Sequence, residues 1–132
     1  METKTATIKG GEFLIKETDP QDVFTPEEFN EEQRMMAQTC VDFVENEVTP
    51  LLDRLDNHEE GLMESLMKKA GELGLFAVSA PEQYGGLNMD FNTSLLVTES
   101  VGGGHSFPVA FAAHTGIGTL PILYFGTEEQ KQ

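Results

Sequence analysis

Residues 25–55 read TPEEFNEEQRMMAQTCVDFVENEVTPLLDRL, and this stretch decides the fold class. Its apolar residues recur at steps of three and four, the spacing that places side chains on one face of an α-helix. That face is formed by Met36, Cys40, Phe43, Val44, Val48, Leu51, Leu52 and Leu55. We interpret the stripe as core packing. Pro50 is expected to kink or interrupt the helix, because proline has no backbone N–H to donate.

The start of this helix has two candidate positions. Thr25, Pro26 and Glu28 form a capping box with proline at the first helical position, and Phe24 can pack on Phe29 as a hydrophobic staple. A second start, Asn30 with Gln33, lies five residues further on. Residues 1–24 are expected to form an extended N-terminal arm, with one short strand around residues 13–15.

The rest of the chain also favours helices. A second helix is predicted over residues 62–73, with one face formed by Leu62, Leu66, Ala70 and Leu73, and with Gly74 as its terminator. Proline and paired glycines predict an ordered surface loop over residues 81–86. A third helix is predicted over 91–101, capped by Asp90 and ended by residues 102–104, followed by a fourth over 106–118 and a fifth over 119–125, entered through Pro121. The fold class is therefore all-α, a bundle of five to six helices.

The last residues announce a further helix. Thr127 and Gln130 form another capping box, but the chain ends at Gln132. So few residues cannot offset the cost of helix nucleation. We therefore expect that the sequence is a truncated part of a longer protein.

The composition is that of a soluble globular domain. The 132 residues are 39% hydrophobic and 23% charged, with one cysteine. The net charge of −15 argues against binding to nucleic acid or to anionic lipid. There is no basic, apolar leader and no apolar run near the roughly 18 residues of a membrane span. The expected location is cytoplasmic.

Charge is unevenly distributed along the chain. Seventeen of the 23 acids lie between Glu2 and Glu64, and no lysine or arginine occurs over residues 70–130. A solvent-facing surface normally carries charge. We therefore expect the second half to be covered by another domain, another subunit or a ligand.

No catalytic or metal-binding arrangement is evident. The glycine run 102–104 lacks the spacing of a phosphate-binding loop, and the histidines and Cys40 show no metal-ligand spacing. His105 is expected in a turn, and His114 as a hydrogen-bonded interior histidine. Glu99, the only acid that looks interior, is interpreted as a helix cap or interdomain partner. The small residues of 106–118 allow either close helix packing or an apolar channel for a ligand tail.

Residues 30–132 resemble the N-terminal domain of acyl-CoA dehydrogenases. The resemblance is carried, in order, by the segments EQRMM (32–36), FVENEVTP (43–50), GELGLF (71–76), PEQYGG (81–86), GTLP (118–121) and FGTEEQK (125–131). Residues 25–132 would form this helical domain, without the middle β-domain and the C-terminal four-helix bundle of the family. The arm segment GGEFLI (10–15) is similar to members that act on long and very long acyl chains.

The resemblance implies an FAD-dependent α,β-dehydrogenation of fatty acyl-CoA in β-oxidation, with electrons passed to an electron-transferring flavoprotein. It also implies a homo-oligomeric complete enzyme. The family's catalytic glutamate and most of its flavin contacts lie beyond this segment, so no catalytic residue is assigned here. The floor of the acyl pocket would include Phe111, Ala112, Ala113, Gly116, Ile117 and Leu120. The alternatives are a freestanding non-catalytic helical binding module and an acyl-CoA oxidase-like enzyme.

Overall fold

The computed structural model describes Ile8 and residues 10–132. Within these residues the chain forms helices and turns, and no strand occurs among them. The chain divides into two units, Met1–Glu31 and Glu32–Gln132. Residues 1–7 and 9 of the expected arm lie outside the described part.

The first unit contains three short 3₁₀ turns, η1 (Glu12–Leu14), η2 (Pro20–Asp22) and η3 (Pro26–Glu28). The strand expected at residues 13–15 is wrong, because the Leu14 N–H donates locally to the Gly11 carbonyl at 2.9 Å. The staple is confirmed, with the Phe24 and Phe29 ring centroids 5.1 Å apart.

The capping box at residues 25–28 forms, and the Thr25 N–H donates to the Glu28 carboxylate at 3.0 Å. It closes only the single turn η3, because Phe29 leaves the helical conformation with ψ at 128°. The long helix begins at Glu31, next to the second predicted start.

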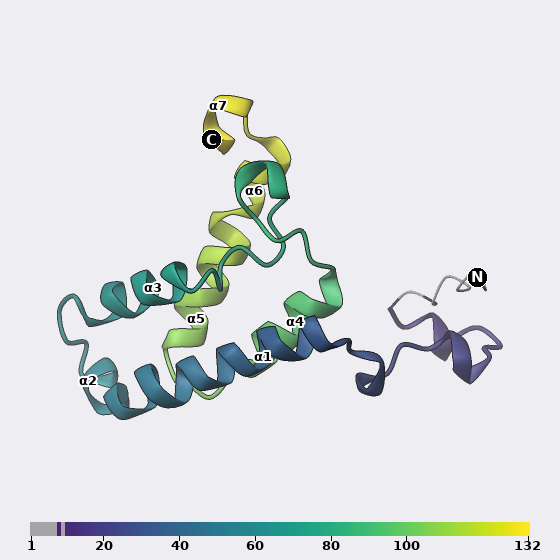
Figure 1. Cartoon of the computed structure of the whole chain (residues 1–132), viewed down its shortest axis with the longest axis horizontal. Coiled ribbons are helices and arrows are strands. Elements are labelled where there is room, and N and C mark those ends of the chain that lie inside the picture. Colours follow the sequence, from purple (N-terminus) through teal and green to yellow (C-terminus); the bar gives the residue numbers. More distant parts are fainter. Residues whose placement is uncertain (1–7, 9) are drawn as a thin grey trace. The chain divides into compact units, whose positions relative to one another are not determined.

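The second unit carries the main helices (Figure 1). In chain order they are α1 (Glu31–Phe43), the π-helical turn η4 (Val44–Val48), η5 (Thr49–Leu51), α2 (Leu52–Asp56), α3 (Leu62–Glu72), η6 (Glu82–Tyr84), α4 (Phe91–Ser100), α5 (Phe107–Ala112), the π-helical turn η7 (Ala113–Gly118), α6 (Leu120–Phe125) and α7 (Glu128–Lys131). The predicted all-α class is confirmed.

The core confirms the apolar stripe. Cys40, Phe43, Val44, Val48 and Leu55 are buried, and Met36, Leu51 and Leu52 pack against them. They meet buried residues from the other helices and loops, namely Leu66, Ala70, Leu75, Val78, Val97, Val101, Phe107 and Phe111. The stripe is therefore the core face of the domain, as predicted.

The end of α3 differs from the prediction at one residue. Leu73, which was expected on the buried face, is 54% exposed. Gly74 adopts a left-handed φ of 74°, a conformation that glycine allows at a helix end, and the Leu75 N–H reaches back to the Ala70 carbonyl at 3.1 Å. The chain therefore buries Leu75 in the position expected of Leu73.

Two π-helical turns accommodate the two prolines within the long helices. In η4 the Thr49 hydroxyl donates to the Val44 carbonyl at 2.9 Å, and Pro50 follows. In η7 the Thr119 hydroxyl and N–H both donate to the His114 carbonyl, at 2.7 and 3.1 Å. A widened turn uses carbonyls five residues back, so a proline can follow without ending the helix.

The second of these turns corrects a prediction. Residues 106–118 and 119–125 were expected to form separate helices, but residues 107–125 form one helical rod, which Figure 1 shows leading to α7. We call α5, η7 and α6 together the 107–125 rod. Pro121 is carried inside the rod because η7 has already widened the helix before it.

The Asp90 cap is confirmed and joins two helices. Its carboxylate accepts from the Thr93 N–H at 2.8 Å and from the Thr93 hydroxyl at 2.6 Å. The buried Gln33 of α1 donates its side-chain N–H to Asp90 at 3.2 Å and to the Thr93 hydroxyl at 2.8 Å. This node ties the start of α4 to α1.

Replacing Asp90 with alanine is expected to lower the free energy of unfolding by about 1 kcal/mol, the usual effect of losing an N-cap. The Thr93 hydroxyl, by hydrogen bonding, holds the pKa of the Asp90 carboxyl below its ordinary value. The contribution should therefore be complete above the unfolded-state pKa, about 3.9, and be lost as the pH falls through the lower folded-state pKa. Urea titrations across this range test it, with Glu60→Ala as an exposed control that should change little.

Candidate functional site

The six residues predicted as an acyl-pocket floor all lie on the 107–125 rod but not on one side of it. Phe111 is buried, and Phe111, Gly116 and Leu120 line a hollow inside the domain. Ala112, Ala113 and Ile117 are exposed, Ile117 by 82%, and do not line that hollow. The structure therefore brings three of the six together and separates the other three.

The hollow has a volume of about 220 Å³, and we call it the apolar hollow. Besides the three floor residues, its lining comprises Thr115 and Tyr124 of the rod, Phe91, Ser94, Val97 and Thr98 of α4, and Leu75, Phe76, Val78 and Ser79 from the connection after α3. The walls of α4 and of residues 75–79 were not predicted from the sequence. An opening of this kind, enclosed by apolar side chains, suits an apolar group.

Two hydroxyls of this lining are turned away from the hollow. The Thr98 hydroxyl donates to the Ser94 carbonyl at 2.8 Å, and the Thr115 hydroxyl donates to the Phe111 carbonyl at 3.0 Å. Each threonine satisfies its polar atom within its own helix. The hollow is therefore less polar than its residue types suggest.

The rod also carries an exposed apolar surface. Val109, Ile117 and Phe125 are exposed by 70%, 82% and 88%. On length and composition the rod could cross a membrane, with 11% of its most apolar window buried, so the expectation of no such run was wrong. A helix covered by other protein passes the same test. This surface fits the expectation that the second half of the chain is covered.

A second hollow, of about 350 Å³, lies on another side of the rod. Its walls are Ala80 and Tyr84 of the preceding loop, His114, Gly118, Thr119, Ile122 and Leu123 of the rod, and Gln130 and Lys131 near the end of the chain. His114 corrects a prediction, because it is exposed and its ring packs on Phe76 at 4.5 Å between centroids. We call this the α7 hollow.

The remaining candidate groups give no catalytic centre within the described residues. Glu99 is exposed at the end of α4, so it is not the interior acid that was expected. His105 lies in a turn with φ at 52°, as predicted, and its Nδ1 is 3.1 Å from Asp56. Burial raises the pKa of the Cys40 thiol to about 11, so Cys40 is not a nucleophile at neutral pH. Within the described residues no group of three potential ligands is placed to hold a metal ion.

The family model for the N-terminal domain of acyl-CoA dehydrogenases matches residues 30–132. The chain therefore belongs to the acyl-CoA dehydrogenase N-terminal domain family. The match covers the second unit, which contains the rod and both hollows.

Individual relatives agree with this family. A probable acyl-CoA dehydrogenase of Bacillus subtilis (strain 168) is 45% identical over 133 positions, which span all of this chain and 22% of the relative. The mitochondrial short-chain specific acyl-CoA dehydrogenase of Sus scrofa is 36% identical over 111 residues, 83% of this chain and 27% of the relative. The crystal structure of an acyl-CoA dehydrogenase complexed with FAD from Bacillus anthracis superposes with a TM-score of 0.87 at 46% identity, over 95% of this chain and 22% of that chain.

Two facts follow from these relatives. The chain spans about a quarter or less of their length. They include a short-chain enzyme and enzymes with no stated chain length, so they support the family and not the long-chain subtype inferred from the arm.

Proposed function

We propose that this chain is the N-terminal helical part of an FAD-dependent acyl-CoA dehydrogenase that oxidises fatty acyl-CoA between its α and β carbons. The family match over residues 30–132 carries the proposal. In this role the chain contributes binding surface rather than reacting groups. Its described residues supply apolar walls that exclude water from the acyl chain, and no proton transfer is assigned to them.

The residues of this chain do not hold FAD by themselves. The diphosphate of FAD requires cationic side chains or free N–H groups. No lysine or arginine occurs over residues 70–130, and Lys131 is paired with Glu128 at 3.2 Å. We therefore assign the main FAD contacts to parts of the enzyme outside this segment, and we assign no reaction step to this chain.

We propose that the acyl tail lies against the 107–125 rod and that the enzyme prefers long chains. The small side chain of Ala113 and the absent side chain of Gly116 support this idea, since a Cβ placed on Gly116 meets no atom within 4 Å. The two residues differ in place: Gly116 lines the apolar hollow, and Ala113 is exposed outside it. Substituting each one separately therefore tests the two sides of the rod.

Replacing Ala113 with leucine in the complete enzyme is expected to shorten the preferred acyl chain. The added methylene groups would occupy space needed by the distal end of a long chain, and a clash of this size changes kcat/KM by about 10-fold or more. The measurement is kcat/KM for straight-chain acyl-CoAs of increasing length. Gly116→Leu reports on the apolar hollow, and Gly103→Leu, in an exposed turn, is the matched control. Chain-length profiles that coincide for all four proteins would reject the pocket.

We further propose that the complete enzyme is a homo-oligomer and passes its electrons to an electron-transferring flavoprotein, as the family resemblance implies. An oxidase of the same fold would instead consume oxygen. Parallel assays of oxygen consumption and of flavoprotein reduction by the complete enzyme separate the two.

A freestanding helical module is the alternative from another class. An antibody to this segment, used on extracts of the source cells, tests it directly. A band several times heavier than 132 residues supports the dehydrogenase. A band at the mass of 132 residues supports a binding module that uses the exposed face of the rod.

A further inference from the structure

The loop of residues 77–89 is closed at its neck and rigid. Backbone N–H groups of residues 87–89 donate across the neck to carbonyls of residues 77–80, over distances of 2.8–2.9 Å. Gly86 packs so closely on Ala80 that a Cβ would lie 1.9 Å from the Ala80 carbonyl oxygen. The base of the loop is anchored, because Val78 belongs to the buried core. The loop therefore presents its tip, residues 81–86, from a fixed base.

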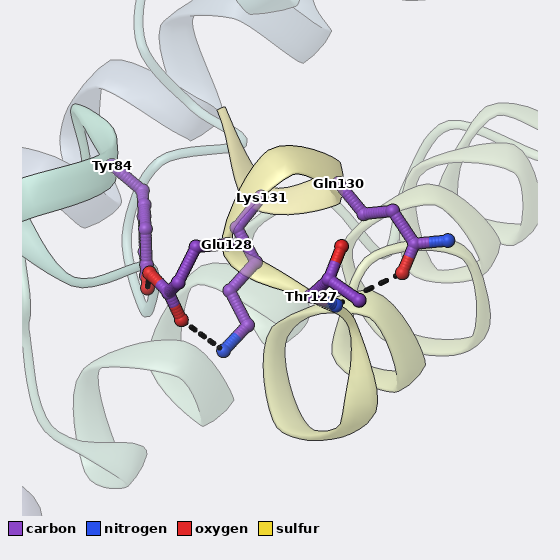
Figure 2. A network of polar contacts seen from close by, with 5 residues as sticks. All are labelled: Tyr84, Thr127, Glu128, Gln130 and Lys131. Atoms are coloured by element: carbon purple, nitrogen blue, oxygen red, sulfur yellow. Dashed lines mark hydrogen bonds and ion pairs between the residues drawn. The ribbon is translucent and has the colours of Figure 1, made fainter.

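The tip of this loop contacts the helix at the far end of the sequence. The Tyr84 hydroxyl donates to one carboxylate oxygen of Glu128 at 2.7 Å. The Lys131 ammonium donates to the other oxygen at 3.2 Å and lies 5.8 Å from the centre of the Tyr84 ring. Figure 2 shows the Lys131–Glu128 contact with Tyr84 beside it. Although α7 has no buried residue, the Lys131 side chain is only 16% exposed.

Helix α7 needs support from outside itself. It has four residues, and its local support is the capping box, in which the Thr127 N–H donates to the Gln130 side chain at 2.9 Å. A helix of one turn does not persist in water on its local hydrogen bonds alone. The contacts with Tyr84 supply a link to an anchored part of the fold.

The same link spans the α7 hollow. Ala80 and Tyr84 form the loop wall of that hollow, Gln130 and Lys131 form the α7 wall, and the rod lies between them. We propose that Tyr84 and Glu128 form a clasp that closes α7 onto loop 77–89 and so decides whether the α7 hollow is enclosed. When the clasp opens, the side of the rod that carries His114 and Ile122 becomes an open surface.

The clasp is tested by NMR on the 132-residue chain, without FAD or acyl-CoA, so the result does not depend on the proposed dehydrogenase function. The backbone order parameters of residues 128–131 are expected near 0.85 in the wild-type chain and below about 0.6 in Tyr84→Phe, the values of rigid and flexible backbone. Glu128→Ala should behave like Tyr84→Phe. Glu128→Gln keeps an oxygen that accepts from Tyr84 and should restore most of the order, which separates the hydrogen bond from the charge.

Three controls make the test specific. Glu129→Gln, on the neighbouring residue, removes the same charge and should leave residues 128–131 ordered. The methyl signals of Ile122, in the α7 hollow, should shift in Tyr84→Phe, while those of Val97, in the apolar hollow, should not. The midpoint of global unfolding should change little, because Tyr84 and Glu128 lie outside the core. Equal order of residues 128–131 in the wild-type chain and in Tyr84→Phe, whether high or low, would overturn the clasp.

Discussion

Replacing Phe107 with alanine is expected to lower the free energy of unfolding by about 3–5 kcal/mol, the range for removing a buried phenylalanine. Phe107 is fully buried, and its ring lies 5.6 Å from that of Phe43 and 6.0 Å from that of Phe111. The substitution removes apolar burial and leaves a cavity between α1 and the rod, at a point where three aromatic side chains support one another. Urea unfolding followed by circular dichroism measures the change.

The matched control is Phe125→Ala on the same rod. Phe125 is 88% exposed, so its removal should change the free energy of unfolding of this chain by no more than about 0.5 kcal/mol. In the complete enzyme the gap between the two effects can narrow, because the proposed function places other parts of the protein on the exposed face. Equal losses in the isolated chain would mean that the rod does not pack as the structure shows.

The core of this fold could be predicted because it depends on local periodicity. The stripe from Met36 to Leu55 repeats at helical steps over more than five turns, and every residue of it is buried or packs on the core. The Asp90 cap was predicted for the same reason, since a cap acts within one turn. Such features need no knowledge of what lies across the domain.

The wrong predictions concern features set by the tertiary structure or by rare backbone geometry. Pro121 was expected to begin a separate helix, but the π-helical turn before it lets the rod continue. His114 and Glu99 lie in apolar sequence surroundings and were expected inside, yet both are exposed. Neighbours in sequence do not determine which side of a helix faces the core when the helix is apolar on every side.

The candidate site was found only in part for a related reason. The small residues of the rod marked it as a possible wall, and Phe111, Gly116 and Leu120 do line the apolar hollow. The facing wall on α4 includes Ser94 and Thr98, which the sequence presents as polar. The Thr98 side chain becomes part of an apolar wall only because its hydroxyl bonds to its own helix. That conversion is a property of the folded helix and has no signal in the sequence.

Replacing Gly86 with alanine is expected to lower the free energy of unfolding by about 3 kcal/mol, the upper part of the range for forcing an extra carbon into a packed site. The new Cβ would lie 1.9 Å from the carbonyl oxygen of Ala80 and 2.3 Å from its carbon, and backbone atoms cannot rotate away as a side chain can. The neck of loop 77–89 must then open, which breaks hydrogen bonds of residues 87–89 and displaces Val78 from the core.

Because loop 77–89 lines both hollows, Gly86→Ala should affect them together. Amide exchange at residues 87–89 should become faster, and the methyl signals of Val97 and Ile122 should both shift, whereas Tyr84→Phe should move only the second. Gly103→Ala is the matched control, since a Cβ there meets no atom within 4 Å and its stability should change by no more than about 0.5 kcal/mol. If Gly86→Ala leaves exchange at the neck unchanged, the loop is not the rigid base on which the Tyr84 clasp depends.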